Sequence, residues 1–276
     1  MPASAPIPPP NLVRALLCLV GAGACLGLST NMAKIASDAG LAGLPFLAWS
    51  ILGASMLLGA NAALRRDLPA INGRIVEYFF VAALVTVAAS NLISFLAVPK
   101  VGVGFVSLAI TLPPLLTYVG AIVLRMKAFS WLRATGVAAA LAEAAYLALE
   151  KLASPSADIT WISLTLLGPV LLAIGNLYRS LRWPSGVSAE ALAPGMLCAA
   201  TLLLMGVSFL PGFDLSVPST TNVPLLLICG QAIVFAVQFS LLFMLGGLKS
   251  EAQHPSRKVY TWIRRRSTAS FSPRTG

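Results

Sequence analysis

This sequence predicts an all-α, polytopic membrane protein with about eight transmembrane helices. Of its 276 residues, 58% are hydrophobic and 10% are charged, whereas a typical soluble domain has about a quarter charged residues. The mean hydropathy is +0.86. The apolar residues form long runs, each close to the roughly 20 residues that cross a hydrocarbon core of about 30 Å. These observations favour membrane-spanning helices over a water-soluble fold.

The order of the predicted elements follows from the apolar runs and from the residues that interrupt them. Residues 1–11 carry several prolines and little to bury, so we expect a disordered lead. Turn-forming Pro, Gly and Asn residues separate the runs that follow, for example at Pro69, Pro99, Pro155 and Pro211. The predicted helices cover residues 12–35, 44–64, 75–98, 102–124, 131–152, 159–181, 189–209 and 223–245.

The distribution of positive charge tests this division of the helices independently. Cytoplasmic loops of membrane proteins are enriched in Lys and Arg. With eight helices, one side of the membrane receives sixteen of the nineteen basic residues, and the other receives only Lys34, Lys100 and Lys151. Arg179 and Arg182 belong to the basic side, where we interpret them as residues at a cytoplasmic helix end. The alternation predicts that both termini lie in the cytoplasm.

Charge and residue usage also exclude several functions. The formal net charge is +10, but residues 246–276 carry seven Lys/Arg and one acidic residue, so the basicity is mainly a property of the tail. No aromatic and basic recognition motif accompanies it, which argues against nucleic-acid binding. The single histidine, His254, lies in the tail, so the helices lack histidine for metal binding or for Ser/His catalysis. We therefore expect no enzyme activity and no bound cofactor.

Three segments resemble the bacterial drug/metabolite transporter superfamily, in particular its EamA-like members. They are residues 31–34 (Asn-Met-Ala-Lys) at the end of the first helix, the proline-containing helix around Pro113 and Pro114, and residues 175–184, which include Asn176, Tyr178 and Arg179. The resemblance covers residues 12–245. It implies a fold of two five-helix repeats of opposite orientation, with the substrate path between them.

Compared with that family pattern, the chain contains an incomplete 5+5 arrangement of helices. Residues 12–152 would form the first five-helix repeat, and residues 159–245 would supply only three helices of the second. Residues 246–276 then change abruptly to a polar and basic composition. Two interpretations stay open: a frameshift or truncation that removes two helices, and a native basic tail attracted to anionic lipid.

Ionisable side chains within the predicted helices are the first candidates for a transport site. Glu143 lies near the middle of the fifth helix, where a charge is costly unless it faces protein or water. It is either a proton-coupling or cation-binding carboxylate, or a protonated residue that packs by hydrogen bonds. Lys34, with Asn31 one turn before it, either pairs with a substrate anion or extends to the membrane interface.

Proline and neutral polar residues supply the remaining candidates for the substrate path. Pro113 and Pro114 remove two backbone donors from the fourth helix, which predicts either a helix break that lines the central path or a kink that only packs. Asn91, in the third helix, and Gln231 and Gln238, seven residues apart in the eighth, offer neutral hydrogen bonds. Each of these three either joins helices or lines the path.

Together these features predict a transporter of a small organic metabolite or drug that works by alternating access in a bacterial inner membrane. Its partners would be that small molecule and membrane lipid, and a homodimer stays open. The alternative is a truncated membrane protein without transport activity.

Overall fold

A computed structural model describes residues 12–65, 71–126, 129–152, 158–184, 187, 189–218 and 222–253. Within these ranges the regular structure is entirely helical. The predicted N-terminal lead (1–11) and most of the predicted tail (254–276) lie outside the described residues. The all-α architecture predicted from the sequence is confirmed.

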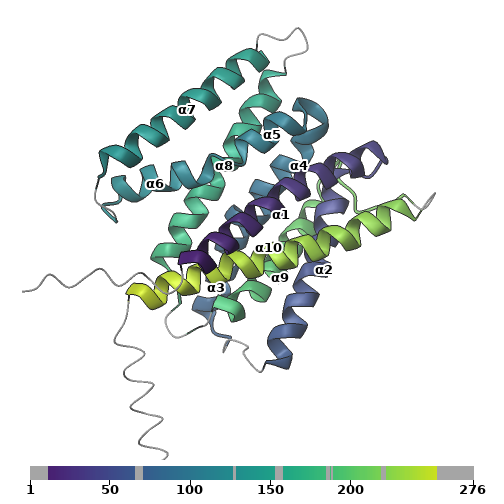
Figure 1. The fold of residues 1–276 in the computed structure, drawn as a ribbon. Coiled ribbons are helices and arrows are strands. Elements are labelled where there is room, and N and C mark those ends of the chain that lie inside the picture. Colours follow the sequence, from purple (N-terminus) through teal and green to yellow (C-terminus); the bar gives the residue numbers. More distant parts are fainter. Residues whose placement is uncertain are drawn as a thin grey trace, which may run out of the picture.

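Eleven helical elements follow one another in the described ranges (Figure 1). They are α1 (Leu12–Asp38), α2 (Gly43–Leu64), α3 (Gly73–Ala83), the π-helix η1 (Leu84–Ala89), α4 (Ser90–Val101), α5 (Val103–Ala109), α6 (Pro113–Val123), α7 (Trp131–Leu152), α8 (Ile159–Leu181), α9 (Ala189–Val207) and α10 (Val223–Gln253).

Six helical stretches of the described chain are long and apolar enough to cross a membrane, so this is a multi-pass membrane protein by length and composition. They are Leu16–Asp38, Gly43–Leu64, Gly73–Val101, Val103–Val123, Ile159–Leu181 and Val223–Leu245. Residues Ala191–Val207 form a shorter apolar helix. The predicted fifth helix forms as α7, with the predicted bounds, but it is not among the six. Of the eight predicted spans, six are therefore matched by a full-length candidate in the structure.

The helices pack around a core to which α2, α4, α9 and α10 contribute. The α1 helix lies alongside α10, and α2 packs between α9 and α10 (Figure 1). The aromatic rings of Phe46, Phe95 and Phe235 stack in this core, with centroids 5.6 Å and 6.2 Å apart along the series. The α7 helix makes few contacts, mainly with α5 and α8. The well-packed part of the bundle therefore excludes α7.

Glycines permit the closest helix contacts. A Cβ added at Gly53 would lie 2.8 Å from Ala232 Cβ, where α2 meets α10, and one added at Gly175 in α8 would overlap the Thr86 methyl group. In lipid, where the hydrophobic effect does not drive association between helices, such small residues allow the close backbone approach on which packing depends.

The third span is a single rod of α3, η1 and α4, in which the π-helix covers Leu84–Ala89. Hydroxyl groups line it at intervals of four residues: Thr86 donates to Ala82 O, Ser90 to Thr86 O and Ser94 to Ser90 O. Pro99, predicted to lie in a connection, is inside α4, which ends instead at Gly102 with φ of 87°. Glycine is the residue that adopts this conformation after a helix at little cost.

Two other spans bear on the sequence prediction. The fourth span contains a helix break, one of the two predicted alternatives: α5 ends at Ala109 and α6 begins at Pro113. Proline at the first turn of a helix needs no backbone partner, so the two prolines start a new helix there. The α10 helix continues past the predicted end at Leu245 to Gln253, because two glycines cost only about 1 kcal/mol each in a helix.

Candidate functional site

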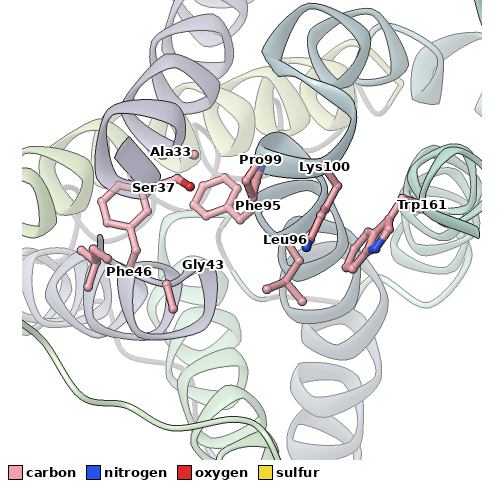
Figure 2. Close-up of a pocket in the computed structure, with 11 residues that line it drawn as sticks. Ala33, Ser37, Gly43, Phe46, Phe95, Leu96, Pro99, Lys100 and Trp161 are labelled. Carbon is pink, nitrogen blue, oxygen red and sulfur yellow. The ribbon is translucent and has the colours of Figure 1, made fainter. Parts of the chain in front are cut away.

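Four helices converge on a cavity of about 220 Å³ at one end of the bundle (Figure 2). The end of α1, the start of α2, the last turns of α4 and the first turn of α8 surround it. Its lining residues are Ala33, Ser37, Leu41, Ala42, Gly43, Phe46, Phe95, Leu96, Pro99, Lys100 and Trp161.

The lining is apolar with a small number of polar groups. Phe46 and Phe95 form an aromatic wall, and Lys100 and Trp161 lie next to each other on the opposite side (Figure 2). Ser37 adds a hydroxyl group. A site with apolar walls and a few polar groups fits a small amphipathic molecule, and the ammonium group of Lys100 favours one with a negative charge.

Local structure explains the position of Lys100. It lies in the last turn of α4, where the negative end of the helix dipole favours a cation. Gly102 then ends the helix. Asp158, the residue directly before α8, caps this helix by accepting a hydrogen bond from the Trp161 backbone amide at 3.2 Å, so Trp161 lies in a capped first turn.

Polar residues inside the bundle join helices. Gln231 Nε2 in α10 donates to Ser29 Oγ in α1 at 2.6 Å, and Thr30 Oγ1 lies 3.3 Å from Ser107 Oγ in α5. Gln231 is fully buried, and its Oε1, like that of buried Gln238, has no hydrogen-bond partner among the described residues. Both glutamines therefore retain an unused acceptor inside the protein.

The eight site residues predicted from the sequence do not come together. None of Asn31, Lys34, Asn91, Pro113, Pro114, Glu143, Gln231 and Gln238 lines the cavity. Asn31 is exposed and donates to Gly27 O, while partly buried Asn91 donates to Val87 O. Lys34 forms an exposed ion pair with Asp38 at 2.6 Å, which contributes only about 0.3–0.5 kcal/mol. Glu143 is exposed on α7.

A second cavity, of about 190 Å³, lies between α2, α9 and α10. It is lined by Leu58, Asn61, Ala62, Arg65, Ala193, Ser240, Phe243 and Met244. Beside it, Arg179 of α8 places its guanidinium carbon 4.8 Å from the centroid of the Phe243 ring. The sequence predicted Arg179 to be an ordinary helix-end residue, whereas in the structure its side chain packs inside the bundle.

Sequence reasoning also missed the first cavity. The charge distribution placed Lys100 at a helix end on the charge-poor side, and Phe46 and Phe95 are indistinguishable in the sequence from other apolar core residues. The available signal was that Lys100 is one of only three basic residues on the charge-poor side.

The fold and the two cavities described above indicate an integral membrane protein whose helical bundle encloses polar groups and could hold a small molecule. Comparisons with family models, with curated proteins and with solved structures give no match for this chain.

Proposed function

We propose that the protein is a transporter of a small amphipathic organic metabolite that works by alternating access. The cavity between α1, α2, α4 and α8 is the observation that carries this proposal, because four separate helices can change its shape by moving against one another. The break between α5 and α6 and the π-helix η1 support it, since interrupted helices are common at transport and other functional sites.

The finer architecture belongs to the same proposal. Eight spanning segments would be reached if α7 and α9 also cross the membrane, and both termini then lie in the cytoplasm of a bacterial inner membrane. The lopsided distribution of Lys and Arg supports this orientation. The resemblance to the drug/metabolite transporters supports an arrangement of inverted repeats.

Flux into proteoliposomes tests the proposal. The purified full chain is reconstituted, and uptake from a panel of small metabolites, both anionic and neutral, is compared with that of empty vesicles. We expect uptake of an anionic amphipathic compound, with a KM up to about fivefold higher for Lys100→Ala, because Lys100 is exposed and an exposed ion pair contributes about 0.2–1 kcal/mol.

Lys34→Ala provides the comparison, because Lys34 lies at the same end of the bundle but outside the cavity. We expect it to leave the KM unchanged. The reverse pattern, a raised KM for Lys34→Ala only, would restore the site predicted from the sequence and remove the cavity from the proposal.

A transport-inactive membrane protein is the second candidate. It is favoured by the exposure of Asn31 and Glu143 on the outside of the bundle, since polar residues in a membrane normally face protein or water. Vesicles that hold correctly folded protein but show no flux for any compound of the panel would favour this candidate.

A further inference from the structure

Arg179 lies within the bundle without a carboxylate partner. Its guanidinium group is surrounded by protein atoms, although the side chain as a whole keeps some exposed surface. The Nε atom has no accessible surface and no hydrogen-bond partner. Among the described residues, no carboxylate forms an ion pair with Arg179. Burying a cation without a counter-charge costs free energy, so a negatively charged ligand would stabilise this position.

The groups around Arg179 are suited to an anion. The Tyr78 ring of α3 stacks on Tyr178 with centroids 6.0 Å apart, which holds the Tyr78 hydroxyl group next to the guanidinium. That hydroxyl group is buried and also lacks a hydrogen-bond partner. The hydroxyl group and the guanidinium interact with each other electrostatically, but neither Tyr78 Oη nor Arg179 Nε has a hydrogen bond of ordinary geometry to an acceptor among the described residues.

Phe243 connects these donors to the second cavity. One side of its ring contacts Arg179, and the same residue lines the cavity of α2, α9 and α10. That cavity is also lined by Arg65, Asn61 and Ser240; Arg65 Nε donates to Asn61 Oδ1 at 3.2 Å, and Ser240 Oγ donates to Ala236 O at 2.8 Å. The Phe243 ring therefore lies between the cavity and the guanidinium.

We propose that Arg179 and Tyr78 form a binding site for a phosphate-type oxyanion, reached from the cavity of α2, α9 and α10 past Phe243. Guanidinium groups bind phosphate oxygens through paired hydrogen bonds. Arg179 stands two residues before the end of the α8 span, and headgroups lie at the ends of membrane spans. The oxyanion is therefore either a free phosphate group or the headgroup of an anionic phospholipid. The proposal is independent of transport, because binding is an equilibrium property.

Ligand-induced stabilisation tests it. The full chain in neutral detergent is heated with sodium phosphate, with sodium chloride at equal ionic strength, with phosphatidylglycerol or with phosphatidylcholine. A ligand that binds only the folded state raises the unfolding midpoint. We expect phosphate or phosphatidylglycerol to raise the midpoint of the wild-type protein, and chloride and phosphatidylcholine to leave it unchanged. A response to phosphate identifies a soluble anion, and a response to phosphatidylglycerol alone identifies the headgroup.

Two variants and a matched control locate the site. Arg179→Gln is expected to weaken the apparent affinity at least about tenfold, as for loss of a charge-assisted hydrogen bond. Tyr78→Phe keeps the stacked ring and is expected to weaken it about three- to tenfold. Arg182→Gln changes an exposed arginine one turn further on and is expected to respond like the wild type.

The unliganded midpoint separates a binding site from a structural role. If the role of Arg179 is to bind an anion, the unfolding midpoint of Arg179→Gln without ligand is equal to or higher than that of the wild type. No midpoint shift with either anion, or an undiminished shift in Arg179→Gln, overturns the proposal. If Arg179→Gln does not fold, Tyr78→Phe decides: a response equal to the wild type overturns the proposal as well.

Discussion

At the scale of single residues, the contact of Gly175 with Thr86 shows how closely α8 approaches the third span. A methyl group at Gly175 would overlap the Thr86 methyl group. We expect Gly175→Ala to lower the free energy of unfolding by about 1–3 kcal/mol, the usual cost of overpacking. Reversible unfolding in mixed micelles, followed by circular dichroism, measures the change.

Thr86→Ser offers a rescue, because it removes the methyl group and keeps the hydroxyl group that donates to Ala82 O. The double variant Gly175→Ala with Thr86→Ser should recover most of the loss, which gives a coupling free energy between the two positions. Gly136→Ala in α7 is the control, since an added Cβ there meets no atom within 4 Å. Equal losses for both glycine variants would contradict the close contact.

The hydrogen bond between Gln231 and Ser29 is the second residue-scale prediction. A double-mutant cycle with Gln231→Ala and Ser29→Ala should give a coupling of about 0.6 kcal/mol and no more than about 1.7, the range for hydrogen bonds between membrane helices. The bond joins α10 to α1 at 2.6 Å. A coupling near zero would mean that the two side chains do not meet in the membrane.

At the scale of elements, Thr111 and Leu112 lie in the break between α5 and α6 and differ in exposure. Thr111 is exposed, whereas Leu112 is buried. If the break lines a water-filled path, a cysteine at Thr111 reacts with a membrane-impermeant maleimide, and a cysteine at Leu112 reacts at least about tenfold more slowly. The native cysteines are first replaced by serine or alanine. Lack of labelling at Thr111 from either side of the membrane would place the break against lipid or protein.

The α7 helix carries Glu143 on an exposed face and contributes little to the packed core. We expect the free energy of unfolding of Glu143→Gln to lie within about 0.5 kcal/mol of the wild-type value, as for a surface substitution. If Glu143 couples transport to protons, the same variant loses the pH dependence of flux in proteoliposomes. Wild-type flux and pH dependence would remove the coupling role that the sequence suggested.

At the scale of the whole molecule, the orientation of the bundle is open to a direct test. Reporter fusions that are active on only one side of the membrane are placed after residues 68, 127 and 185 and after residues 41 and 155. We expect the first three to report the cytoplasm and the other two the opposite side, as the distribution of Lys and Arg requires. If residues 127 and 155 report the same side, α7 does not cross the membrane, and the topology has fewer than eight spans.

Much of the architecture was predictable because membrane helices are local structures. Each helix satisfies its own backbone hydrogen bonds, so an apolar run of sufficient length identifies it without knowledge of its neighbours. The predicted bounds of α7 and α8 are those observed. The prediction at Pro99 was wrong, because the residue was judged by its average tendency to end a helix, whereas α4 continues through it to Val101. Its position within the turn decided the outcome.

The sequence by itself determined the all-helical membrane architecture and the order of the helices, because hydropathy and length act along the chain. Only the tertiary structure decided which side chains meet. Lys100 and Trp161 lie together at one cavity, and Arg179 lies beside Tyr78 and Phe243, although each group comes from helices far apart in the sequence. The physical reason is that polar groups in lipid find partners through helix packing, and packing depends on the shapes of all the helices together.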